Sequence, residues 1–181
     1  MSNDAVQTAH ATVDALFEQH RGAFGRDHES YRGHVHRVLG LVAHQLDIPP
    51  AAARAVGVAA FHHDVGIWLD HTWDYLPCST TRAVESLAPD DRHLAPLVEA
   101  IIGEHHRLRR ARGDDPLAEA FRRADMADIY HPLAPVPARS RPRYAELVAS
   151  YPYGRFRRML LRAFLRGLRE NPRRPMPMVK F

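Results

Sequence analysis

Apolar residues recur every three or four positions along most of the chain, which is the spacing of one face of an α-helix. Between residues 5 and 20 this face carries Val6, Ala9, Val13, Leu16 and Phe17. Between residues 29 and 46 it carries Val35, Val38, Leu39, Val42 and Leu46. No stretch of the sequence shows the sustained alternation of β-branched and polar residues that a half-buried strand requires. The pattern therefore predicts an all-α fold.

Helix-breaking residues divide this pattern into segments. We expect helices at residues 5–20, 29–46, 51–65, 79–88, 91–107, 116–129, 143–150 and 154–169. Residues 66–79 are predicted to be a loop, and residues 131–142, which are rich in proline, an irregular connector. The 181 residues suit one core, so the expected architecture is a single-domain helical bundle. It divides into an N-terminal helix and connector (1–27), a central core (28–130) and a C-terminal part (131–181).

The cysteine content restricts the kinds of site that the chain can form. Cys78 is the single cysteine, which excludes an internal disulfide and a thiolate zinc cluster within one chain. The sequence begins without the pattern of a signal peptide, and it has no apolar run long enough to span a membrane. We therefore expect a cytoplasmic protein with no membrane partner.

Charge is distributed unevenly along the sequence. Residues 1–138 carry 13 basic and 19 acidic side chains, whereas residues 139–181 carry 12 basic and 2 acidic ones. The arginines at 154–169 alternate with apolar residues, with Phe156, Leu160, Phe164 and Leu168 on one face. Such a helix suits either docking on a core or a membrane surface. We expect docking on the acidic body, with the extended tail crossing it. A nucleic-acid partner is not expected, and a homodimer is left open.

Histidines and aspartates on or beside the apolar stripes predict a metal site. His34, the pair His63 and Asp64, and Asp125 fall there, with Asp128 as a rival to Asp125 one turn later. A buried carboxylate without a partner is costly, and a metal ion would satisfy it. The competing interpretation is a buried His–Asp hydrogen bond. Imidazole and carboxylate ligands suit Mn, Fe, Co or Ni, so we expect one divalent transition-metal ion per chain.

The segments YRGHVHRVLGLV, AAFHHDVGIW and FRRADMAD carry these residues in the order H…HD…D. In that order they resemble the HD-domain superfamily of metal-dependent enzymes, over roughly residues 28–181. The resemblance implies a helical core at residues 28–130 that binds the metal ion. It also implies a phosphohydrolase in which a metal-bound water attacks a nucleotide or another small phosphate ester. His36 becomes an outward or flanking residue in this alignment.

A minority of that superfamily are di-iron oxygenases that cleave C–C or C–P bonds. Those members place a histidine at the start of the helix after the HD pair, where this chain has Ser79. This favours one ion and hydrolysis, although His71, His93, His105 or His106 could supply a further ligand. Four ligands favour hydrolysis, and six or more with two ions favour the oxygenase. Ile67 stands where hydrolytic members often carry a glutamate, so the general acid or base is left open.

The remaining candidate residues concern catalysis and substrate binding. Asp64 would position the attacking water, and His105 or His106 would bind a phosphoryl oxygen, protonate a leaving group or complete a second metal site. Trp68 would wall the substrate pocket, or else anchor its loop. Arg122 and Arg123 could form a fork for phosphate, or be solvated. A third hypothesis is a non-catalytic helical module that binds a ligand, against which the complete set of ligands argues.

Overall fold

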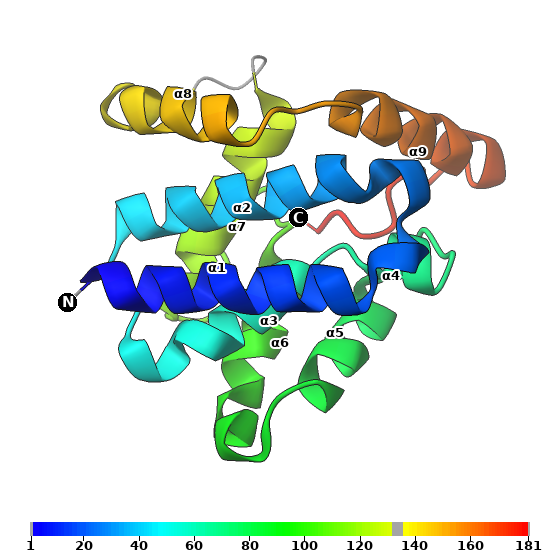
Figure 1. Cartoon of the computed structure of the whole chain (residues 1–181). Helices are drawn as coiled ribbons and strands as arrows, with labels where there is room; N and C mark the ends of the chain where they lie inside the picture. Colours follow the sequence, from blue (N-terminus) through cyan, green and yellow to red (C-terminus); the bar gives the residue numbers. More distant parts are fainter. Residues whose placement is uncertain (1, 132–135, 181) are drawn as a thin grey trace.

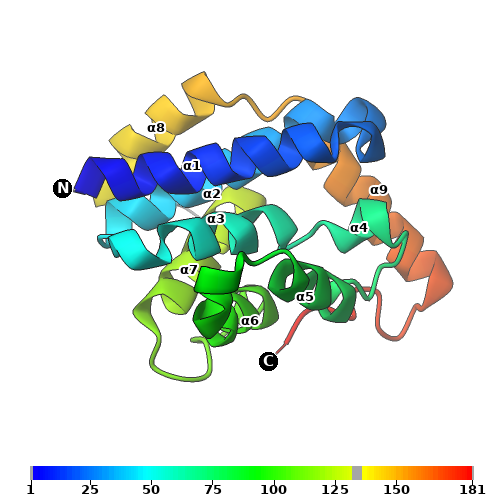
Figure 2. The same ribbon diagram turned by 60° about the horizontal axis from the view of Figure 1, so that its bottom comes forward.

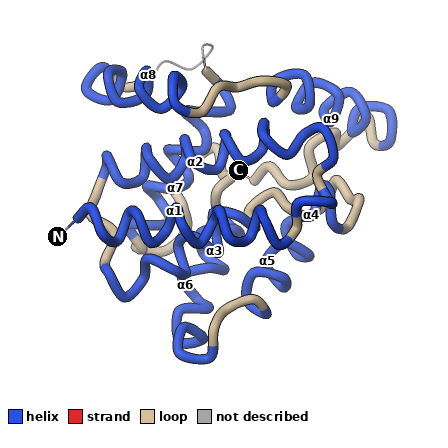
Figure 3. The backbone as a smooth tube through the Cα atoms, viewed as in Figure 1, coloured by secondary structure: helices blue, strands red, loops and turns tan. Residues whose placement is uncertain are grey.

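The computed structural model describes residues 2–131 and 136–180. Within them the helices are α1 (Ser2–Gln19), α2 (His28–Gln45), α3 (Ala53–His62), α4 (Gly66–Leu69), α5 (Leu76–Glu85), α6 (Ala95–Glu104), α7 (Pro116–Tyr130), α8 (Arg141–Ser150) and α9 (Phe156–Glu170). Short 3-10 turns are η1 (Arg21–Ala23), η2 (Gly25–Asp27), η3 (Pro50–Ala52), η4 (Pro89–Leu94) and η5 (Ala138–Ser140). The predicted all-α fold is confirmed. Figure 3 shows helices joined by loops, and the described residues form no strand beyond one isolated bridge between Arg107 and Lys180.

Four helices enclose the centre of the molecule. The long helix α2 packs against α1, α3, α7 and α8, and α6 packs against α3, α5 and α7. Figure 1 shows α1 and α2 running side by side, with α8 and α9 along the upper edge. Figure 2, turned about the horizontal axis, brings α5 and α6 forward. The inner faces of α2, α3, α6 and α7 therefore converge on one region.

Several loop and helix boundaries differ from those predicted. The predicted loop at 66–79 contains α4, and α5 begins at Leu76, because Pro77 suits the first turn of a helix. The predicted helix at 91–107 begins as the 3-10 turn η4 and ends at Glu104. His105 and His106 therefore lie in a turn beyond the helix. Part of the predicted connector, residues 132–135, lies outside the described residues.

The sequence predicts that His36 is an outward or flanking residue, and the outward alternative is wrong. Its side chain is fully buried, on the side of α2 that packs against α1 and α8. Nε2 lies 2.9 Å from Asp14 Oδ1, and the ring stacks on Tyr151 at 4.7 Å between centroids. Burial lowers the pKa of His36 to about 4, so the imidazole is neutral at neutral pH.

The prediction of which residues of the C-terminal helix face the core is also partly wrong. Phe156, Met159 and Gly167 of α9 are buried, but Phe164 and Leu168 are exposed. Among the described residues, no arginine of α9 pairs with a carboxylate of the body, so charge does not set the docked face. It is set instead by Phe156, whose ring stacks on His34 at 4.3 Å, and by Gly167, where an added Cβ would lie within 3 Å of Pro175 O.

The tail after α9 returns to the core, as predicted. Trp73 Nε1 donates a hydrogen bond to Pro175 O at 2.7 Å, and Met178 is buried. Leu108 N donates to Lys180 O at 3.0 Å. The tail therefore crosses the turn that follows α6. Within the described residues no helix is long and apolar enough to cross a membrane.

Gly57 allows α1 and α3 to approach closely, and this contact is testable. A Cβ at Gly57 would lie 2.7 Å from Ala9 O and 2.8 Å from Thr12 Cβ of α1. We expect Gly57→Ala to lower the free energy of unfolding by about 1–3 kcal/mol, because the added methyl forces the helices apart. Urea denaturation followed by circular dichroism measures the change.

Gly103 in α6 is the matched control, because an added Cβ there meets nothing within 4 Å. Gly103→Ala should raise stability by about 0.5–1 kcal/mol through helix propensity alone. Equal effects of the two substitutions would contradict the close packing of α1 on α3.

Candidate metal centre

Six side chains from four parts of the chain converge where the inner helices meet. One comes from the middle of α2 and one from α7, two follow the last residue of α3, and two follow the last residue of α6. We call them the six-donor cluster: His34, His63, Asp64, His105, His106 and Asp125. Because α3 and α6 both end at this point, their final turns aim side chains at the faces of α2 and α7. The four ligands expected from the sequence are therefore brought together, along with His105 and His106.

The distances within the cluster are those of atoms around a common centre. His34 Nε2 lies 3.1 Å from His63 Nε2 and 3.2 Å from Asp125 Oδ1. His63 Nε2 lies 3.5 Å from Asp64 Oδ2, and His105 Nε2 lies 3.3 Å from Asp64 Oδ1. His106 Nδ1 lies 3.9 Å from Asp125 Oδ2.

These donors form three overlapping groups whose ligand atoms lie within 4.8 Å of one another. The groups are His34, His63 and Asp125; His63, Asp64 and His105; and His105, His106 and Asp125. Each of these groups could hold a metal ion. The groups share His63, His105 and Asp125, so one ion or an adjacent pair could use the same donors.

Hydrogen bonds on the far side of three imidazoles fix which nitrogen faces the centre. His63 Nδ1 lies 2.7 Å from Ala60 O, and His105 Nδ1 lies 2.7 Å from Ile102 O. A carbonyl oxygen can only accept, so each Nδ1 carries a proton and each Nε2 faces inward, where it can bind an ion once it is deprotonated. His34 Nδ1 donates in the same way to Asp128 Oδ2 at 2.8 Å. This is the orientation that metal-binding histidines require.

Asp128 orients His34 and lies outside the six-donor cluster. Arg37 donates two hydrogen bonds to its carboxylate, at 2.7 and 2.8 Å, and Tyr144 donates another at 3.0 Å. Tyr153 also contacts this carboxylate and Tyr144. With its oxygens already bonded, Asp128 is less suited than Asp125 to bind an ion. The sequence left this choice open.

Asp125 lacks the partners that a buried carboxylate needs. Its side chain is about 1% exposed, and neither oxygen has a hydrogen-bond partner among the described residues, although His34 Nε2 is close. Asp64 is also buried, and nearby histidines keep its pKa well below the usual range despite burial. The cluster thus holds two carboxylates, while Arg37 neutralises Asp128. A divalent cation would balance this charge, so the residues fit such an ion.

The pKa values show that protons and an ion would compete for the cluster. Burial lowers the pKa of His34, but the adjacent carboxylates of Asp125 and Asp128 outweigh it and raise the pKa to about 9. Burial also lowers the pKa of His105, but the contact with Asp64 outweighs burial, so the pKa is raised. His63 has no such support, and burial lowers its pKa to about 4. Without an ion, therefore, a proton on His34 offsets part of the carboxylate charge.

His106 lies on the most accessible side of the cluster. Its side chain is 12% exposed, against 3% or less for the other five donors. Tyr75 Oη lies 2.6 Å from His106 Nε2, and burial raises the pKa of Tyr75 well above its usual value. The phenol therefore stays protonated and fixes the imidazole. Of the two histidines predicted near the pocket, His106 is partly exposed and His105 is fully buried.

The predicted substrate residues lie outside the cluster. The Trp68 ring packs on Tyr31 at 4.4 Å between centroids, and Tyr31 separates it from His34 and His63. Arg122 is paired with Glu119 and also donates to Arg107 O at 3.1 Å, so it supports the turn after His106. Arg123 is exposed and paired with Glu119 at 2.8 Å.

Ser79 and the other histidines considered as ligands have different surroundings. Ser79 Oγ accepts a hydrogen bond from Gly66 N at 3.0 Å, so it joins α5 to α4. His71 and His93 are exposed, and His93 Nδ1 is bonded to Asp90 O. Sequence reasoning missed the roles of Arg37 and Tyr144, and it considered Tyr75 only as a pocket wall or a loop anchor. Arg37 follows His34 by one helical turn. This arginine was the one signal in the sequence for the ion pair between Arg37 and Asp128.

Comparison of the chain with protein-family models, with curated proteins and with solved structures gives no match.

The histidine pair 62 and 63 provides a matched test of the cluster. We expect His63→Ala to abolish binding of a divalent transition metal, because three of its contacts are to cluster donors. It should also cost about 1–3 kcal/mol of stability, since Asp64 loses a partner. Metal content after purification on a nickel-free column and equilibrium denaturation measure the two effects.

His62→Ala is the control, because His62 is equally buried but donates to Val58 O and lies outside the cluster. This variant should keep the metal content of the wild type. Full metal occupancy in His63→Ala would contradict the assignment.

The proton competition predicts a steep pH dependence of metal binding. An ion must displace the proton that His34 retains at neutral pH, because its pKa is raised to about 9, and the raised pKa of His105 adds to this competition. Apparent affinity for Mn²⁺ should therefore rise about tenfold per pH unit for each displaced proton, between about pH 6 and pH 8. Calorimetry in two buffers of different protonation enthalpy counts the protons released. An affinity independent of pH would contradict this account.

Proposed function

We propose that the chain is a metal-dependent hydrolase of the HD-domain type that acts on a nucleotide or another small phosphate ester. The observation that carries the proposal is the convergence of three inward-facing Nε2 atoms and two buried carboxylates, in the order of the H…HD…D motif. Mn, Fe, Co and Ni suit these donors. The complete set of donors also argues against a non-catalytic module.

His34, His63, Asp64 and Asp125 would hold the ion, and His105 adds a further donor. A bound divalent ion supplies a Lewis acid that polarises the phosphoryl oxygen and lowers the pKa of water. The protein residues then position the reactants. Asp64, whose lowered pKa keeps it ionised, orients the attacking water and accepts its proton.

His106 is placed to act on the leaving group. Its position at the accessible side of the cluster puts it between the ion and an entering substrate. As the bond between phosphorus and the leaving oxygen breaks, the water oxygen forms the new bond and a protonated His106 donates its proton to the leaving oxygen. Burial and His105 lower the pKa of His106 in the free protein, so the imidazole takes up this proton when the negatively charged substrate binds beside it. Tyr75 holds the imidazole through its hydrogen bond to Nε2.

The catalytic role of His106 gives a direct test. We expect His106→Ala to lower kcat for p-nitrophenyl phosphate or a nucleoside monophosphate by about 10²–10⁴-fold, with Mn, Co or Ni supplied. The fold should remain, because His106 lies at the edge of the core. Tyr75→Phe, which loses only the hydroxyl contact to His106, should have a smaller effect.

His93→Ala is the control, since His93 is exposed and its imidazole is bonded to Asp90 O, not to a residue of the six-donor cluster. Its turnover should equal that of the wild type. Unchanged kinetics in His106→Ala would return His106 to the role of a surface residue.

The second candidate is an HD-domain iron oxygenase that cleaves a C–C or C–P bond. The presence of six donors in overlapping groups favours it, because two ions need more ligands than the four expected from the sequence. Ser79 favours hydrolysis, since a serine bonded to Gly66 N stands where the resemblance places an iron ligand. Two iron atoms per chain with oxygen uptake on turnover would establish the oxygenase. Phosphate release with one ion would establish the hydrolase.

A further inference from the structure

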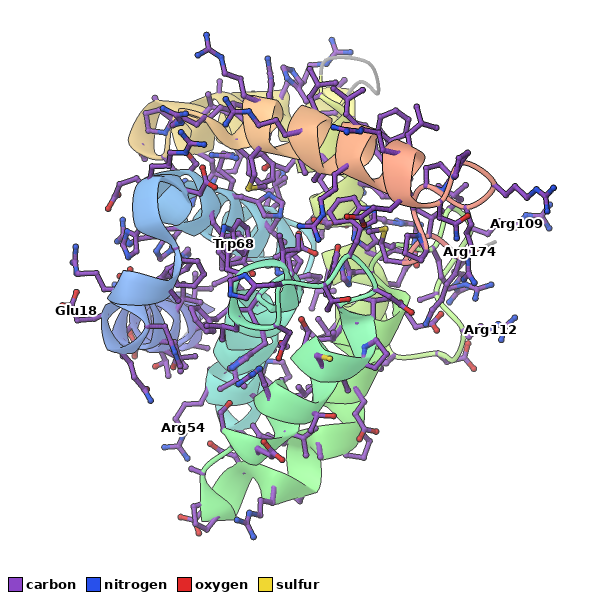
Figure 4. All side chains as sticks on the ribbon, turned by 90° about the vertical axis from the view of Figure 1, so that its right-hand side faces the viewer. Glu18, Arg54, Trp68, Arg109, Arg112 and Arg174 are labelled. Atoms are coloured by element: carbon purple, nitrogen blue, oxygen red, sulfur yellow. The ribbon has the colours of Figure 1, made fainter. Side chains whose placement is uncertain are left out.

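Helix α9 carries an unusual apolar surface. Five large apolar side chains are strongly exposed among the described residues, and four of them are on this helix, at 39–58% exposure. They are Leu161, Phe164, Leu165 and Leu168. Their spacing of three and four residues places them on one face, beside the docked face that contains Phe156. Figure 4 shows α9 along the edge of the molecule, with side chains that project away from the body.

A row of arginines borders this apolar face. Arg158, Arg162, Arg166 and Arg169 follow one another at three- and four-residue spacing, and all are exposed. Among the described residues only Arg166 of these four has an acidic partner, Glu170 at 2.7 Å. The helix therefore presents unpaired positive charge next to exposed leucine and phenylalanine.

The same row borders a cavity of about 250 Å³ between α9 and the segment around α4. Arg162 and Arg166 line one part, Arg26 lines another, and Trp68 and Trp73 form walls. Arg26 has no acidic partner among the described residues. Guanidinium groups bind phosphate oxygens, and indole rings suit the interface between water and lipid.

We propose that α9 binds the surface of an anionic phospholipid bilayer, with Leu161, Phe164, Leu165 and Leu168 in the interface and the arginine row on lipid phosphates. An apolar face bordered by arginines is the pattern of interfacial helices. A nucleic acid would not require the four apolar side chains. A symmetric pairing of two copies of α9 would bring two arginine rows together, which opposes it. The proposal replaces the sequence-based expectation of no membrane partner, and it does not depend on the metal centre.

Co-sedimentation of the full chain with vesicles tests this proposal. Binding to phosphatidylcholine vesicles that contain phosphatidylglycerol should exceed binding to phosphatidylcholine alone by at least about tenfold and should weaken at high salt. Each Arg→Gln change at Arg162 or Arg169 should weaken binding by about fivefold. Arg109→Gln, at an exposed arginine outside α9, should not.

Leu165→Ser should weaken vesicle binding by about tenfold, because the leucine leaves the interface. Leu108→Ser is the matched control, since its exposure of 43% is close to the 48% of Leu165. Equal circular dichroism and metal content of the variants show that the fold is intact. Light scattering gives the oligomeric state. Absence of vesicle binding, or a dimer that Leu165→Ser dissociates, would overturn the proposal and assign the face to another occupant.

Discussion

The structure depends on how three buried carboxylates are neutralised. Asp64, Asp125 and Asp128 lie in the interior, and three helices (α4, α5 and α6) separate Asp64 from the other two in the sequence. Ionised groups cannot remain there without partners, because desolvation costs several kcal/mol for each. Asp128 has Arg37 and two tyrosines. Among the described residues no arginine or lysine pairs with Asp64 or Asp125, which are surrounded mainly by imidazoles. This difference separates the structural pair from the candidate metal centre.

The Asp128 and Arg37 pair joins the core to the C-terminal part. Arg37 on α2 bonds Asp128 on α7 and also donates to Tyr151 O after α8, at 2.7 Å. Its guanidinium lies 4.0 Å over the ring of Tyr153. Removing one member of such a buried pair costs about 3–5 kcal/mol, because the other charge remains. The same pair orients His34, so the geometry of the centre depends on packing well outside it.

The arrangement also explains why one side of the centre is more open than the others. His34, His63 and Asp125 are enclosed by helices, whereas His106 lies in a turn that the tail crosses through the bridge at Lys180. A short turn after α6 and an extended tail cover less surface than a helix does. The most accessible side of the cluster is therefore the side that carries His106. Proton transfer to a bound substrate would require a titratable group at such a position.

The sequence by itself determined the helical class and four of the six donors. Apolar spacing directly reports which face of a helix is buried, so His34, Asp64 and Asp125 could be placed in the interior from their positions on it. The roles of His36, Asp128 and Ser79 could not be read in this way. Spacing gives a residue's face but not the neighbour that this face meets.

Tertiary structure decided what those neighbours are. It buried His36 against Asp14, gave Asp128 to Arg37 rather than to the cluster, and placed His105 and His106 with the other donors. It also chose which of two apolar faces of α9 is docked, through the ring of Phe156 and the lack of a side chain at Gly167. Sequence periodicity treats these faces as nearly equivalent. The choice depends on shape and on hydrogen bonds between distant segments, which exist only when the chain is folded.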